Sequence, residues 1–68
     1  MEEIVIKVGG MSCQGCVKGV GGALQALPGV ADVAVSLDAG EARVRFDPAQ
    51  VSIVELRAAI EDAGFDAA

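Results

Sequence analysis

The sequence predicts an α+β fold in which two helices cover one face of a four-stranded antiparallel sheet. Two observations lead to this prediction: three segments alternate apolar and polar residues, and two longer segments repeat apolar residues with the period of a helix. The segments follow one another in the order strand, helix, strand, strand, helix, strand. A parallel sheet covered on both faces would show continuous apolar runs instead. The predicted architecture is therefore the ferredoxin-like βαββαβ sandwich.

The first part of the chain contains one predicted strand and one predicted helix. Residues 3–8 form a strand whose apolar residues share one face: Ile4, Ile6 and Val8. Residues 13–26 form a helix whose apolar residues recur at helical spacing: Val17, Val20, Leu24 and Leu27. Pro28 and Gly29 end this helix, because a residue that precedes proline disfavours the helical conformation.

A β-hairpin is predicted next. Residues 33–37 and residues 42–46 both alternate apolar with small or charged residues, and a short connection containing Gly40 joins them. Arg43 and Arg45 fall on the outward face of the second of these strands.

The second helix has clear signals at both of its ends. Ser52 and Glu55 predict a capping box, and Val51 and Leu56 predict a hydrophobic staple across the first turn. The predicted buried face consists of Ile53, Leu56, Ile60 and Ala63. Gly64 is placed to end the helix, with Phe65 folding back over Ile60, and residues 65–68 remain for a short last strand.

Length and composition exclude several classes of function. A chain of 68 residues is expected to form one domain, residues 1–68, too small for both a core and a deep substrate cavity. Histidine is absent, so Ser–His and Cys–His catalytic pairs are excluded, and we expect the protein not to be an enzyme. The net charge of −5 and the two aromatic residues argue against nucleic-acid binding, which favours basic stripes and stacking platforms.

No targeting or membrane-spanning segment is predicted. The first three residues carry two glutamates, whereas a signal peptide begins with positive charge. The longest stretch without charge, residues 19–31, is interrupted by Pro28 and is too short to cross a bilayer. We therefore expect a cytoplasmic protein with reduced thiols and no direct membrane insertion.

The chemistry is concentrated in residues 10–16, where Cys13 and Cys16 lie three positions apart between a strand and a helix. The N-terminus of a helix stabilises anions and so favours the thiolate form of cysteine. Two thiolates are too few for a closed zinc site but suit Cu(I), a soft ion that accepts few ligands. A pair of cysteines at this spacing could alternatively serve as a redox dithiol.

The segment Gly10-Met11-Ser12-Cys13-Gln14-Gly15-Cys16 resembles the GMxCxxC signature of heavy-metal-associated domains, and the resemblance extends over the whole chain. It implies that Cys13 and Cys16 are the ligands of one Cu(I), and that Met11 is a buried anchor of the loop. Relatives that handle zinc, cadmium or lead often carry Asp at the position of Ser12, so the serine favours Cu(I). The resemblance also implies that Phe65 approaches the metal from the opposite side.

The family includes copper chaperones and the N-terminal modules of copper-transporting P-type ATPases. The resemblance implies a carrier that delivers Cu(I) to such an ATPase by thiolate exchange. Met1 and the one-domain length favour a free carrier, whereas Phe65 is commoner in ATPase modules, so the module is the alternative. A dithiol oxidoreductase is a second alternative. We expect a monomer without metal, and a second copy could complete the copper coordination in a Cu-bridged dimer.

Overall fold

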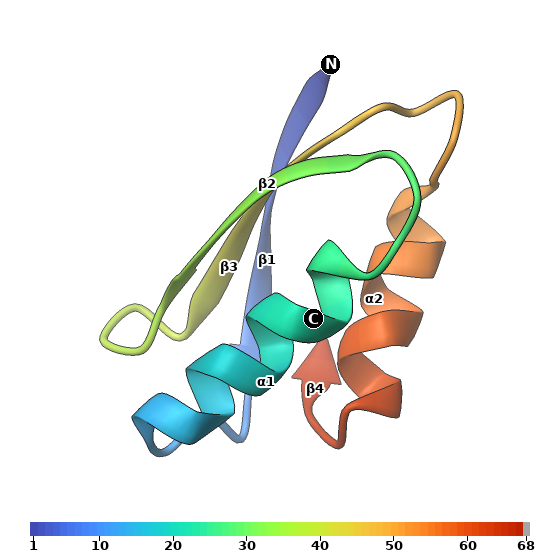
Figure 1. Cartoon of the computed structure of the whole chain (residues 1–68). Coiled ribbons are helices and arrows are strands. Elements are labelled where there is room, and N and C mark those ends of the chain that lie inside the picture. The colour runs from blue at the N-terminus through green and yellow to red at the C-terminus, as the bar shows by residue number, and fades with distance from the viewer. Residues whose placement is uncertain (68) are drawn as a thin grey trace.

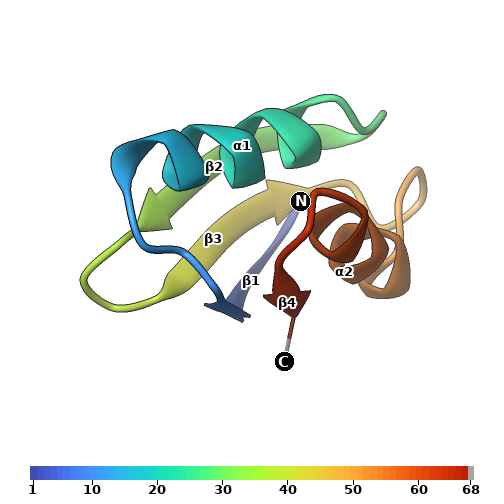
Figure 2. The same ribbon diagram turned by 90° about the horizontal axis from the view of Figure 1, so that it is seen from below.

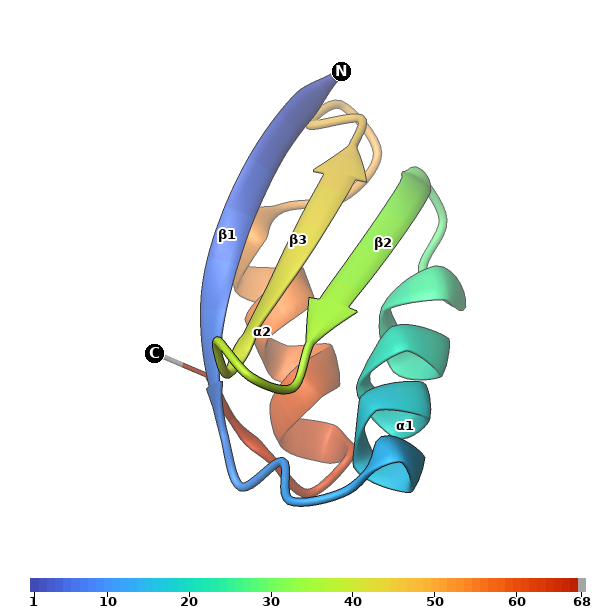
Figure 3. The same cartoon turned by 90° about the vertical axis from the view of Figure 1, so that its left-hand side faces the viewer.

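A computed structural model describes residues 1–67, and its elements are ordered as the sequence predicts (Figure 1). They are β1 (Glu2–Gly9), α1 (Gln14–Gln25), β2 (Val30–Ser36), β3 (Glu41–Phe46), α2 (Ile53–Asp62) and β4 (Asp66–Ala67). The strands form one sheet in the order β2-β3-β1-β4, with every neighbouring pair antiparallel. Both helices lie behind this sheet in Figure 3. The predicted ferredoxin-like sandwich is therefore confirmed.

The core lies between the sheet and the two helices. It is built from the inward positions of β1 and β3 and from the apolar faces of the helices: Ile6, Val8, Val20, Leu24, Ala42, Val44, Phe46, Val51, Leu56 and Ile60. Successive residues of a strand point to opposite faces, so Arg43 and Arg45 are exposed on the side of the sheet away from the core. One face of the sheet is therefore covered and the other is in contact with solvent, as the alternation predicts.

Local signals set both ends of α2. The Ser52 hydroxyl accepts a hydrogen bond from the Glu55 N–H, and the Glu55 side chain accepts one from the Ser52 N–H, which confirms the capping box. At the other end, Gly64 has φ +94°. Its N–H donates to the Glu61 carbonyl at 2.9 Å and the Phe65 N–H donates to the Ile60 carbonyl at 3.2 Å. These two bonds form a Schellman motif, which turns the chain back toward β1.

The predicted buried face of α2 is wrong at its two ends. Ile53 is 39% exposed and Ala63 is exposed, whereas Ala59 packs against the core. Ala63 is the C-cap residue of α2, where the chain leaves the helix, and its side chain is not part of the core. Ile53 lies in the first turn of α2, while the two described residues of β4 follow the opposite end of the helix.

The observed boundaries of the strands differ slightly from the predicted ones. β2 begins at Val30, three residues earlier than predicted, because a bulge between Val30 and Asp32 interrupts the alternation there. The last strand, predicted over residues 65–68, is observed at Asp66–Ala67, and Ala68 lies outside the described residues. Neither helix in the described part of the chain is long and apolar enough to cross a membrane.

Candidate metal centre

The loop between β1 and α1 places both cysteines at the start of the helix. Gly10 follows β1 with φ +92°, a conformation that glycine adopts without strain. Cys13 is the N-cap residue of α1, and its carbonyl accepts hydrogen bonds from the N–H groups of Cys16 at 3.1 Å and Val17 at 3.3 Å. This turn brings the two side chains to the same side of the helix end.

The two sulfur atoms form a pair that is open to solvent. Cys13 Sγ lies 3.1 Å from Cys16 Sγ, so one thiol can donate a hydrogen bond to the other, and both cysteines are free. Cys13 is exposed and Cys16 is partly buried. Within residues 1–67 no group of three or more His, Cys, Asp or Glu side chains could hold a metal. The pair can therefore supply two soft ligands, while the solvent side stays open to a ligand from another molecule.

The thiol of Cys16 is more acidic than an ordinary cysteine thiol. A backbone hydrogen bond from Ser12, and next a hydrogen bond from the Cys13 side chain, lower the pKa of Cys16 from 9.0 to about 7, although partial burial opposes this shift. Both hydrogen bonds stabilise the charged form of the sulfur. At neutral pH a large share of Cys16 is therefore thiolate, the form that binds metals and reacts with electrophiles.

The lowered pKa of Cys16 gives a testable pH profile. Because only the thiolate reacts, we expect alkylation of Cys16 by iodoacetamide to accelerate about fivefold to tenfold from pH 6 to pH 8 and then level off. Peptide mapping by mass spectrometry follows Cys16 separately from Cys13. In the variant Cys13→Ala, which lacks one of the hydrogen bonds, the profile should move to higher pH. A rate that keeps rising tenfold per pH unit beyond pH 8 would contradict the lowered pKa.

Met11 lies just before the cysteines and faces the interior. It is less than half exposed and packs against the core cluster, so its predicted burial is confirmed. A thioether held in apolar packing anchors the loop to the sheet and helices. That Met11 does not bind the metal stays a prediction.

Phe65 lies beside Gly10, at the start of the loop that carries the cysteines, while its approach to the metal itself stays a prediction. A methyl group on the Cα of Gly10 would lie 3.8 Å from Phe65 Cδ1, and one on Gly19 would lie 3.8 Å from Phe65 Cε2. The ring therefore lies between the start of the loop and the second turn of α1, and it packs partly buried against the core. Its contact with Gly19 was not predicted, since the two residues are far apart in the sequence.

Three connecting segments meet at the end of the sheet that carries the cysteines. The Val8 N–H donates to the Gly40 carbonyl at 2.8 Å, so the β2–β3 turn lies beside the end of β1. β4 pairs with Val8 and Gly9, which brings the α2–β4 connection to the same end (Figures 1 and 2). The end of β1 that leads into the cysteine loop is thus flanked by both segments, and Cys13 remains exposed.

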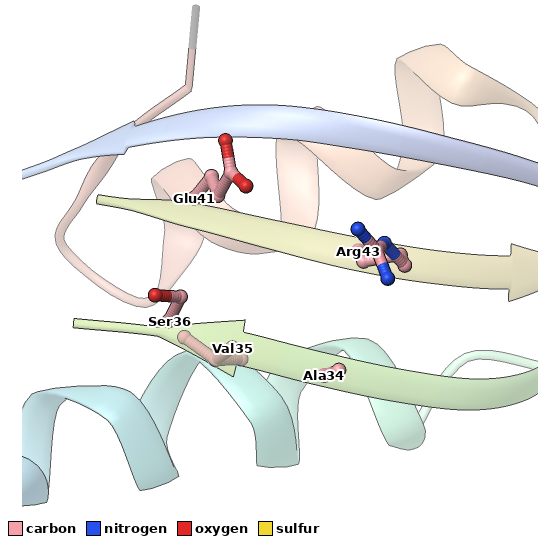
Figure 4. A pocket seen from close by; sticks show the side chains of 5 residues that line it. All are labelled: Ala34, Val35, Ser36, Glu41 and Arg43. Atoms are coloured by element: carbon pink, nitrogen blue, oxygen red, sulfur yellow. The ribbon is translucent and has the colours of Figure 1, made fainter. Parts of the chain in front are cut away.

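A hollow of about 290 Å³ lies on the hairpin rather than at the cysteines. Figure 4 shows its lining on β2 and β3: Ala34, Val35, Ser36, Glu41 and Arg43. These residues include no sulfur ligand, so the hollow is separate from the candidate metal centre.

Comparisons with known proteins agree with the geometry of the site. The profile of the heavy-metal-associated domain family matches residues 5–66. The chain is 47% identical over 68 residues to the copper chaperone CopZ of Bacillus subtilis, and the match covers all of this chain and 99% of that protein. It is 45% identical over 67 residues to copper-transporting ATPase 1 of Mus musculus, and this match covers 98% of this chain but only 4% of the ATPase.

A solved structure shows the same fold in detail. The crystal structure of a copper-binding domain from HMA7, a P-type ATPase, superimposes with a TM-score of 0.98 at 40% sequence identity. The match covers 100% of this chain and 92% of that domain. The likeness therefore extends over both helices and all strands, and over the loop with the two cysteines.

Proposed function

The chain belongs to the heavy-metal-associated domain family, and from this membership we propose that residues 1–68 form one copper-binding domain that carries Cu(I) in the cytoplasm. The observation that supports this most strongly is the pair of free thiols 3.1 Å apart at the start of α1. The likeness to a copper chaperone over its whole length adds the identity of the metal. Cys13 and Cys16 bind one Cu(I) as thiolates.

Cu(I) passes to its acceptor by exchange of thiolate ligands. The metal is cargo, and the open side of the pair admits a thiolate of the acceptor as a third ligand. One sulfur–copper bond forms before another breaks, so the ion is never released into water. As each cysteine of this chain leaves the metal it becomes free to take up a proton. The exchange makes and breaks only bonds of the thiol sulfurs to copper and to protons and converts no substrate, so the domain acts as a carrier and not as an enzyme.

A metal-binding domain of a copper-transporting P-type ATPase is the proposed acceptor. The similarity of this chain to a segment of copper-transporting ATPase 1 supports a matching domain on the acceptor, because two domains of one fold can present their cysteine pairs to each other. The same similarity supports the alternative that this domain is itself the ATPase module and receives Cu(I). In either setting the apo protein is a monomer, and a second copy can share the metal.

Transfer between two domains tests the proposed function. The domain is loaded with one Cu(I), mixed with an apo metal-binding domain of a copper ATPase, and separated from it by ion exchange under anaerobic conditions. We expect copper to divide between the two domains within seconds, even when a chelator that binds free Cu(I) is present in the solution. If the chelator prevents copper from reaching the acceptor, the ion must first be released into solution, and direct transfer is contradicted. A thiol–disulfide exchange assay separates the carrier from a dithiol oxidoreductase, which would reduce a substrate disulfide catalytically.

The ring of Phe65 is expected to slow the loss of copper. Because the ring packs beside the metal loop and carries no charge, it limits access of water and other ligands to the cysteines. In Phe65→Ala we expect faster transfer of Cu(I) to a competing chelator, while both cysteines still bind. Stopped-flow absorbance measures the rate.

Val54→Ala is the matched control for Phe65→Ala. Val54 is 73% exposed on α2 and does not belong to the core, so its replacement should leave the rate of copper loss unchanged. Equal rates in wild type and Phe65→Ala, with both folded, would show that the ring serves packing alone.

A further inference from the structure

Three cross-strand rows of side chains lie on the outer face of the sheet, which is the face away from the core. Directly paired positions on one face bring their side chains within contact distance. Read across β2, β3 and β1, the rows are Asp32, Arg45 and Glu3; then Ala34, Arg43 and Val5; then Ser36, Glu41 and Lys7. Each row contains one base, and the residues beside that base differ from row to row.

Two of these three bases have negative charge beside them. Arg45 lies between Asp32 and Glu3, so its row offers a carboxylate on each side. The Lys7 ammonium lies 3.1 Å from Glu41 Oε2 and forms an ion pair with it. Figure 4 shows the Glu41 side chain reaching toward β1, the strand that carries Lys7, and away from β2. Both bases are therefore balanced by acids of the protein itself.

Arg43 is the base whose row contains no acid. Its paired neighbours are Ala34 on β2 and Val5 on β1, which are both apolar and exposed. Within residues 1–67, its guanidinium takes part in no ion pair and in no side-chain hydrogen bond. The planar array of N–H donors on this side chain therefore remains available to an anion from solution.

The hollow of about 290 Å³ on the hairpin opens beside this guanidinium. It is lined by both apolar and polar residues: Ala34, Val35, Ser36, Glu41 and Arg43. Ser36 Oγ accepts a hydrogen bond from the Ala39 N–H at 3.2 Å, which leaves the Ser36 O–H as a second donor. Ligand pockets usually measure about 300–1,000 Å³, so a ligand of this hollow is small.

A carboxylate attached to a small apolar body matches the groups of the hollow. A guanidinium can donate two parallel hydrogen bonds to one carboxylate, and the apolar body can cover Ala34 and Val35. A dianion fits less well, because Glu41 borders the hollow and the chain carries a net charge of −5. We propose that this hollow binds a small monocarboxylate with an apolar body, held by Arg43 and Ser36.

Titration with benzoate, followed by amide NMR of the apo protein at constant ionic strength, tests the proposal. We expect saturable shifts of the Ala34, Ser36 and Arg43 amides, with a dissociation constant on the order of 1–10 mM. Benzamide has the same shape without the charge, and acetate has the charge without the ring. Both should bind at least about fivefold more weakly than benzoate. Equal affinity for either compound, or shifts that do not saturate, would overturn the proposal.

Two arginine variants separate this site from general attraction to positive charge. Arg43→Gln and Arg45→Gln change the net charge equally, but only Arg43 lines the hollow. We expect the dissociation constant for benzoate to rise about fivefold in Arg43→Gln and to stay within about twofold of wild type in Arg45→Gln. Equal losses of affinity in the two variants would show that benzoate follows charge alone.

Ala34→Leu fills the hollow while it keeps Arg43. Ala34 is exposed and lies outside the core, so the fold should persist while the saturable benzoate shifts disappear. Wild-type affinity in a folded Ala34→Leu protein would contradict the site. Cys13→Ser should bind benzoate like wild type, because the hollow lies on β2 and β3 and contains no cysteine. A failure of the copper proposal therefore leaves this result unaffected.

Discussion

We expect Cys13→Ser and Cys16→Ser each to abolish tight binding of Cu(I), with an apparent affinity that falls by more than the roughly 100-fold that outer-shell substitutions can cost. A serine hydroxyl is a hard, neutral group and cannot replace a soft thiolate. No other His, Cys, Asp or Glu side chain is placed to replace the lost thiolate, since residues 1–67 contain no group of three or more such side chains that could hold a metal. Competition against a chromogenic Cu(I) chelator measures the affinity, and both variants should bind less than one copper per chain.

Gln14→Ala serves as the control for the cysteine variants. Gln14 is exposed, lies between the two cysteines and has no thiol, so its loss should leave the affinity for Cu(I) close to that of wild type. Both cysteines lie outside the core cluster, and the amide NMR spectra of all three variants should show a folded domain. Wild-type affinity in a folded Cys13→Ser protein would refute the two-thiolate site.

Leu24→Ala is expected to have the largest effect on stability. Leu24 is fully buried in α1, and removing most of its side chain leaves a cavity, which typically costs about 2–5 kcal/mol. A domain of this size has only about 3–10 kcal/mol of unfolding free energy in total. We therefore expect the apo variant to lose a large part of its unfolding free energy and to unfold at a much lower urea concentration than wild type. Urea unfolding monitored by circular dichroism gives the difference in free energy.

Val54→Ala again provides the comparison, because it shortens an exposed apolar side chain in a helix. We expect its unfolding free energy to stay within about 0.5 kcal/mol of wild type. Added Cu(I) binds only the folded form, so it should raise the midpoint of Leu24→Ala unfolding. Identical urea midpoints for Leu24→Ala and Val54→Ala would show that Leu24 does not support the core as its burial indicates.

The sequence by itself determined the features that depend on residues close together along the chain. The capping box joins Ser52 and Glu55, the Schellman turn needs only Gly64 and the last turn of α2, and the strand alternation follows from the two-residue period of a strand. The Cys13–Cys16 pair is of the same kind, since three residues at a helix start suffice to bring two thiols together. Each of these features is encoded by spacing alone.

Only the tertiary structure decided which apolar residues are covered and what faces the cysteines. Ile53 has the helical spacing of a core residue, yet it is exposed, whereas Val51, which precedes the helix, is buried in the core. Phe65 reaches Gly10 and Gly19 only because the sheet brings the two ends of the chain together. Burial and contact depend on the segment that lies opposite a residue, and that segment comes from a distant part of the sequence whose exact length and direction no local pattern specifies.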